Sequence, residues 1–160
     1  MALLIQACSA WAHFYAGHST VRTMVAFTHV AALIVAGGTA LVMDRATLRA
    51  SVADDPSRAR QLDALDASHA TIITGLTLVI ASGFLLLAAD VDLFLRSTLF
   101  WTKMGLVALL IVNGIRMRRA AGGARVHDDE PSWHAVRLAS FSSLALWLAT
   151  TLAGVSLPGA

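Results

Sequence analysis

The chain has 160 residues, of which 57% are hydrophobic and 14% are charged, against about 45–50% and about 25% in typical soluble domains. Mean hydropathy is +0.69, and the charged residues gather in short stretches, which excludes an ordinary soluble helical domain. The formal net charge of +2 comes from arginines that bracket apolar stretches rather than from a basic stripe interleaved with aromatics, so it does not indicate nucleic-acid binding. We expect one membrane-embedded domain.

Residues 1–18 form the first predicted element. Its apolar part is roughly 15 residues long, short of the roughly 20 that a transmembrane helix needs. It lacks the positively charged region that begins a signal peptide. Trp11, Phe14 and Tyr15 are aromatic residues of the kind found in the headgroup zone of a bilayer. We predict an interfacial helix here; a fifth span and a cleaved leader are the alternatives.

Four later stretches are long and apolar enough to cross a bilayer. Their predicted bounds are about 23–43, 68–89, 97–115 and 132–155. Backbone groups inside the hydrocarbon must bond to one another, so each stretch is expected to be a helix. Ser68, Ser97 and Ser132 stand where N-caps are expected. The predicted fold class is all-α: an integral-membrane four-helix up-down bundle with a short N-terminal interfacial helix.

The two loops predicted at 44–67 and 116–131 carry most of the positive charge. Eight arginines lie in these loops, whereas the opposite side has only Arg22 and Arg96, with Lys103 inside the third span. The positive-inside rule therefore places both loops in the cytoplasm and both termini on the periplasmic or extracellular side of a bacterial inner membrane. Loop 44–67 contains a helix-compatible stretch, and loop 116–131, with two adjacent glycines, is predicted to be a flexible connection.

Two histidines at the start of predicted spans are candidate haem ligands. His69 and His134 each follow the expected beginning of a span closely, so we expect them at the same level, on two diagonal helices of the bundle. The diagonal is roughly 11–14 Å when neighbouring axes are about 8–10 Å apart. That separation suits two imidazoles with a haem iron between them. Arg137, one turn beyond His134, is expected to pair with a haem propionate.

His29 and Met104 form a second expected layer. His29 lies seven residues after Arg22 and Met104 lies seven residues after Ser97, so each is roughly 10 Å from the outer surface. Imidazole and thioether groups are ligands of haem iron and of copper. Lys103, next to Met104, is an intramembrane cation that we expect either to face the bundle interior or to reach outward and pair with Asp90 or Asp92.

Two sequence strings resemble known membrane families. Residues 100–107, Phe-Trp-Thr-Lys-Met-Gly-Leu-Val, followed by Asn113-Gly114, are similar to the third-helix signature of small uncharacterised bacterial four-helix membrane proteins. His29 followed by Gly37-Gly38 resembles a first-helix pattern that these share loosely with copper-resistance D-type proteins and small membrane-bound protoporphyrinogen oxidases. Those oxidases carry a first-helix histidine and a third-helix lysine and are thought to bind a b-type haem. The resemblance therefore points to His29 and Lys103.

Three functional hypotheses follow. The first is a b-type cytochrome-like electron-transfer protein, with haem b held by His69 and His134, and with His29 as a second ligand or a proton-relay group. No motif provides a substrate pocket, so electron transfer is favoured over catalysis. The second is a non-catalytic membrane subunit of a larger complex with structural histidines. The third is a copper or proton conduit lined by His29, Met104 and Lys103. The expected partners are the lipid bilayer, other membrane subunits or a redox partner.

Overall fold

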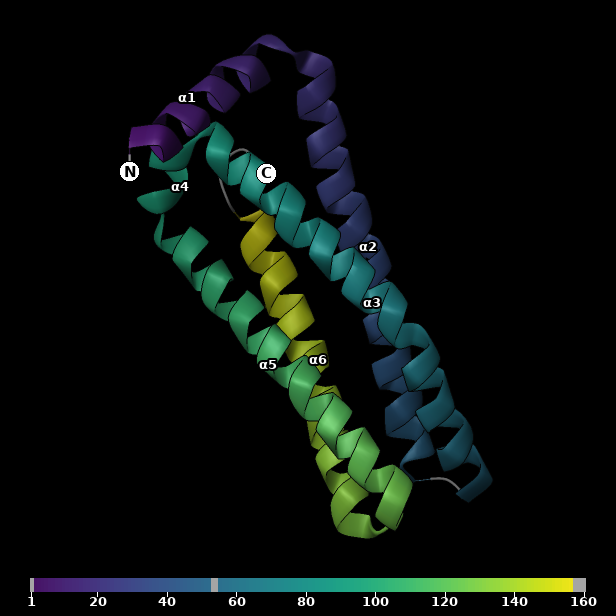
Figure 1. Ribbon diagram of the computed structural model, residues 1–160. Coiled ribbons are helices and arrows are strands. Elements are labelled where there is room, and N and C mark those ends of the chain that lie inside the picture. Colours follow the sequence, from purple (N-terminus) through teal and green to yellow (C-terminus); the bar gives the residue numbers. More distant parts are fainter. Residues whose placement is uncertain (1, 53–54, 157–160) are drawn as a thin grey trace.

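The computed structural model describes residues 2–52 and 55–156, which form six helices and no strand (Figure 1). Four of the helices are long and apolar enough to cross a membrane, as the sequence predicts. They are 26 to 35 residues long, or about 39–53 Å, and therefore exceed a hydrocarbon core of roughly 30 Å. In chain order, the helices are α1 (Ala2–Gly17), α2 (Ser19–Ala50), α3 (Asp55–Ala89), α4 (Val91–Leu95), α5 (Thr98–His127) and α6 (Glu130–Val155).

The connections predicted at 44–67 and 116–131 are mostly helical. Helix α2 continues to Ala50 and α3 begins at Asp55, so Ser68 lies inside α3 and is not its N-cap. Helix α5 continues through Gly122 and Gly123, so the prediction of a flexible glycine connection is wrong. A glycine inside a helix costs only about 1 kcal/mol, and burial of the surrounding alanines against α3 and α6 offsets that cost.

Helix α1 lies across the ends of α2 and α3 (Figure 1), and this end of the molecule is called the α1 end below. With 16 residues, α1 is shorter than a span requires. The indole N–H of Trp11 donates to the carbonyl of Leu85 at 2.8 Å, which attaches α1 to the last turns of α3. Helix α1 is therefore attached to the bundle without being one of its four long helices. Its position at a bilayer interface stays a prediction.

The four long helices form two hairpins, α2 with α3 and α5 with α6, and the hairpins meet mainly through α2 and α6. Small residues on α2 make both contacts possible. On one side, Gly75 of α3 comes so close that an added β-carbon would lie 2.8 Å from that of Ala36. On the other side, Trp147 of α6 covers Gly37, where an added β-carbon would lie 3.1 Å from the indole ring. Helix α2 is thus the central element of the bundle.

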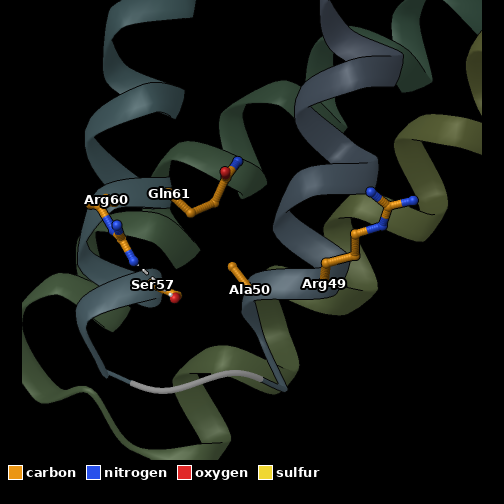
Figure 2. A pocket seen from close by; sticks show the side chains of 5 residues that line it. All are labelled: Arg49, Ala50, Ser57, Arg60 and Gln61. Carbon is orange, nitrogen blue, oxygen red and sulfur yellow. Dashed lines mark hydrogen bonds between the residues drawn. The ribbon is translucent and has the colours of Figure 1, made fainter.

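The opposite end of the bundle, where α2 connects to α3 and α5 to α6, is called the arginine-rich end. It has an open groove of about 360 Å³ beside the α2–α3 connection (Figure 2). Arg60 donates to the Ser57 hydroxyl at 3.2 Å within α3 (Figure 2). Two arginines, Arg49 and Arg60, make the groove cationic. Its lining residues are Arg49, Ala50, Ser57, Arg60 and Gln61.

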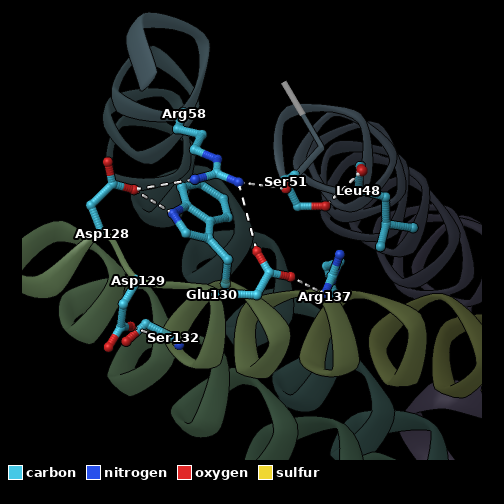
Figure 3. Close-up of polar contacts among 9 residues, drawn as sticks. Leu48, Ser51, Arg58, Asp128, Asp129, Glu130, Ser132 and Arg137 are labelled. Atoms are coloured by element: carbon cyan, nitrogen blue, oxygen red, sulfur yellow. Dashed lines mark hydrogen bonds and ion pairs between the residues drawn. The ribbon is translucent and has the colours of Figure 1, made fainter. Parts of the chain in front are cut away.

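Arg58 joins the two hairpins at the arginine-rich end (Figure 3). It donates to the carbonyl of Ser51 at 3.1 Å and forms ion pairs with Asp128 at 3.8 Å and Glu130 at 3.9 Å. Its guanidinium also lies 5.2 Å from the centre of the Trp133 ring. Trp133 is completely buried and donates to Asp128 at 2.6 Å. One arginine of α3 therefore holds the α5–α6 turn and the end of α2 together.

The glycine contact between α2 and α3 can be tested by adding one methyl group. We expect Gly75→Ala to lower the free energy of unfolding in detergent by about 1–3 kcal/mol, because the methyl group forces the two helices apart. Gly114→Ala is the matched control, since an added β-carbon there meets no atom within 4 Å. That variant should be unchanged or gain up to about 1 kcal/mol. Equal thermal midpoints for the two variants would contradict the close contact.

The start of α6 predicts a pH dependence. Asp129, and not Ser132, is the N-cap of α6. The hydroxyl and the backbone N–H of Ser132 donate to its carboxylate, and these bonds lower the pKa of Asp129. A lowered pKa in the folded state means that the cap stabilises the fold above the ordinary aspartate pKa and loses this effect as the pH falls through the lowered value. In Asp129→Asn, which keeps a capping side chain, thermal unfolding below about pH 4 should lose part of its pH dependence. An unchanged pH profile in this variant would show that the cap does not titrate.

Candidate functional site

Polar side chains lie in two layers between the four long helices, with an apolar layer between them. The α1-side layer consists of His29, Ser82 and Lys103, from α2, α3 and α5. The arginine-side layer consists of Asp44, Asn113 and Ser140, from α2, α5 and α6. The apolar layer between them is centred on Trp147 of α6, which is 6% exposed and packs on the buried alanines of α2. The two polar layers are therefore separate sites in this structure.

Helix α3 orients the imidazole of His29. Its Nδ1 lies 2.9 Å from the hydroxyl oxygen of Ser82. That hydroxyl donates to the carbonyl of Leu78 at 2.5 Å, with the carbonyl of Val79 as a second acceptor at 3.2 Å. Because a carbonyl oxygen only accepts, the Ser82 proton is committed and its oxygen accepts from the Nδ1–H of His29. We therefore assign the neutral ring to the tautomer in which Nε2 carries the lone pair.

Lys103 enters the α1-side layer from α5. Its ammonium group crosses Gly154 of α6, where an added β-carbon would lie 3.3 Å from Nζ, and its charge acts on the imidazole of His29. Among the side chains that the structure describes, no carboxylate forms an ion pair with it. The predicted alternative of a pairing with Asp90 or Asp92 is therefore not seen. All four long helices contribute a residue around the same imidazole and ammonium groups.

The arginine-side layer is more deeply buried. Asp44 is 4% exposed, Asn113 5% and Ser140 0%. The hydroxyls of Ser140 and Ser143 on α6 face the carboxylate of Asp44. The Asn113 amide on α5 donates to the carbonyl of Ala139 on α6 at 2.9 Å. This layer closes the interior of the bundle toward the arginine-rich end.

Sequence reasoning missed Asp44 because the predicted first span ends before it. Helix α2 continues for another six residues after Asp44. The available signal was periodicity: Ala36, Ala40, Asp44 and Thr47 recur at intervals of three or four, and all four are buried. That spacing puts them on one helix face. The carboxylate therefore belongs to the packed face of α2.

The structure does not bring together His69 and His134, the predicted axial pair. His69 lies fourteen residues after Asp55, where α3 begins, whereas His134 lies four residues after Glu130, where α6 begins. These separations correspond to about 21 Å and about 6 Å along the two helices, so the residues are not level. His134 is also exposed, because the neighbouring Trp133 occupies the buried face of α6. The helical 55–67 segment is the physical reason for the difference.

Two other predicted ligand contacts lie away from the interior. The guanidinium of Arg137 bonds to Glu130 at 2.6 Å within α6. Met104 is 40% exposed and points away from the interior that Lys103 faces. Within residues 2–52 and 55–156, no group of three or more His, Cys, Asp or Glu side chains is arranged to hold a metal ion. Of the predicted site residues, the structure brings together only His29 and Lys103.

Comparison with known proteins places the chain in a family. Residues 10–157 match the model of a family described as a family of unknown function, DUF6644. The chain belongs to this family. No curated protein and no solved structure matches the chain. The expected similarity to an uncharacterised family is thus confirmed for this DUF6644 protein. The distant similarity to copper-resistance D-type proteins and membrane protoporphyrinogen oxidases stays a prediction.

The hydrogen bond between α2 and α3 of this DUF6644 protein predicts a nuclear magnetic resonance signature. In protein labelled with ¹⁵N-histidine at neutral to alkaline pH, His29 should show a protonated Nδ1 and an unprotonated Nε2. The His29→Gln variant assigns the signals. In Ser82→Ala, the Nδ1 acceptor is lost and the ring should shift toward the other tautomer, which is the commoner form in water. An Nε2–H tautomer in the unmodified protein would contradict the assignment.

Proposed function

We propose that this DUF6644 protein is a membrane electron-transfer protein of the b-type cytochrome kind, with His29 as an axial ligand of haem b. The observation that supports the proposal is the contact of Nδ1 of His29 with the Ser82 hydroxyl at 2.9 Å, which leaves the lone pair on Nε2, on a helix long and apolar enough to cross a membrane. Histidines that bind metals usually donate their second ring N–H to an oxygen, which fixes the tautomer and the ring orientation. The pair formed by His29 and Ser82 has this arrangement.

The surroundings of His29 suit a haem. Lys103 supplies an intramembrane cation without an ion-pair partner among the described side chains, and a propionate would neutralise it. Gly83 and Gly154 let the imidazole and the ammonium pack close to α3 and α6, since added β-carbons would lie 3.4 Å and 3.3 Å from them. The haem would supply a one-electron couple; the chain would orient one ligand and balance the charge.

The earlier assignment of haem to His69 and His134 is not part of this proposal. Those two side chains are neither level nor both directed inward. The His29 and Lys103 positions are also the ones that the resemblance to the membrane protoporphyrinogen oxidases implies, on a first-helix histidine and a third-helix lysine. We therefore move the expected ligand from the arginine-rich half of the bundle to the α1 half.

The other two hypotheses have less support. In a copper or proton conduit, polar groups would continue through the bundle, but the Trp147 layer separates them and Met104 points outward. In a purely structural subunit, both ring nitrogens of a histidine at membrane depth would have partners. In the described residues, the side-chain partner of the His29 ring is Ser82, at Nδ1. A ligand at Nε2 would give the second ring nitrogen a partner within the bundle.

We also propose the orientation of the chain in a bacterial inner membrane. The eight arginines at the arginine-rich end would lie on the cytoplasmic side, and the α1 end with both termini would lie on the periplasmic side. The aromatic residues of α1 would then rest at the periplasmic interface. His29 would be in the half of the bundle nearer that surface, so its electron-transfer partner would dock there.

The optical spectrum of the detergent-solubilised protein tests the proposal. After expression with ample haem supply, we expect a Soret band and sharp reduced α and β bands. His29→Ala should lose them, while His134→Ala, which changes an exposed histidine, should keep them. Ser82→Ala should weaken haem binding by roughly 10–100-fold. Circular dichroism and gel filtration establish that each variant is folded.

Two outcomes would overturn the proposed haem site at His29. A folded, colourless protein after haem supply would exclude a b-type cytochrome. Retention of the bands in His29→Ala, with their loss in His69→Ala or His134→Ala, would return the haem to the pair predicted from the sequence.

A further inference from the structure

The arginine-side polar layer is not used by the proposed haem site. It places three oxygen-bearing side chains, Asp44, Asn113 and Ser140, at the junction of α2, α5 and α6. Each is at least nine-tenths buried. Polar groups buried to this extent in a protein interior are nearly always hydrogen-bonded, so an unpaired one calls for an explanation.

The three side chains lie at one level of the bundle. The Ser140 hydroxyl faces the carboxylate of Asp44, and the Asn113 amide bonds to Ala139, the residue next to Ser140. Each of the three nevertheless has one buried oxygen without a hydrogen-bond partner among the described residues. These atoms are Oδ2 of Asp44, Oδ1 of Asn113 and Oγ of Ser140. They offer a carboxylate, an amide carbonyl and a hydroxyl, all of which are ligands for hard cations.

The charge of the layer sets the charge of its ligand. No lysine, arginine or histidine forms an ion pair with Asp44 in the described part of the chain, and the adjacent Arg45 is exposed. The hydroxyls of Ser143 and Ser140 face its carboxylate, but a buried carboxylate without a cationic partner is costly unless it coordinates a cation or becomes neutral. A monovalent cation balances one carboxylate, whereas a divalent ion would leave a net positive charge in a low-dielectric site.

We propose that Asp44, Asn113 and Ser140 bind one monovalent alkali cation between α2, α5 and α6. The cation is coordinated by the three oxygens that have no hydrogen-bond partner. Asp44 belongs to the first hairpin, whereas Asn113 and Ser140 belong to the second, so the ion joins the two hairpins. It lies on the arginine-rich side of Trp147 and is independent of the His29 layer.

Sodium binding by the full chain in lipid nanodiscs tests this site. With ²²Na⁺ in choline buffer, we expect saturable binding of about one ion per chain and a thermal midpoint that rises with sodium at constant ionic strength. Asp44→Asn, which keeps the size of the side chain, should lose both effects. Asn113→Ala and Ser140→Ala should each weaken binding about tenfold or more. Asp92→Asn, the same change at an exposed position, is the matched control and should bind like the unmodified chain.

The possible results separate the occupants of the layer. If the unmodified chain binds no sodium and has the same midpoint in sodium and in choline, then water or a proton occupies the layer and the proposal is wrong. Sodium binding that survives Asp44→Asn also overturns it. If Asp44→Asn does not fold, sodium binding by Asn113→Ala and Ser140→Ala, together with the sodium dependence of the unmodified chain, still tests the cation site. His29→Ala should bind sodium normally, so failure of the haem proposal is a distinct result.

Discussion

The close packing of α2 against both α3 and α6 is the contact on which the rest of the structure depends. Ala36 and Gly37 present almost no side chain, so Gly75 approaches from one side and the indole of Trp147 from the other. Helices in a membrane gain little from the hydrophobic effect, so their association relies on such close contacts and on interhelical hydrogen bonds. A larger residue on this face of α2 would push α2 away from α3 or from α6.

That contact also determines where polar groups can lie. Trp147 and the alanines of α2 fill the middle of the bundle, so polar side chains occur in the layers on either side of it. His29 and Asp44 lie on the same helix, fifteen residues and about 22 Å apart, and each meets polar residues from neighbouring helices. A protein of this size thereby has room for two chemically different sites: an imidazole beside an ammonium group, and a carboxylate among neutral oxygens.

The sequence predicts the larger features because the bilayer restricts them strongly. Apolar length identifies four spans, and the positions of His29 and Lys103 follow from their depth within those spans. The pairing of His69 with His134 fails because it depends on the exact start of α3, and hydropathy gives no signal for a helix that continues beyond the membrane. Leu62 and Arg58 extend α3 by packing against α5 and α6, and such tertiary contacts are not visible in local sequence. The unpaired oxygen of Asp44 depends on packing in the same way.

The central claim is that four helices assemble a haem site around Nε2 of His29. An experimental structure of the haem-loaded protein in a lipid nanodisc tests it most directly. Iron within bonding distance of that nitrogen, with Nδ1 still bonded to Ser82 and a propionate near Lys103, is the predicted result. Iron bound by His69 or His134, or a folded protein that takes up no haem at all, would contradict it.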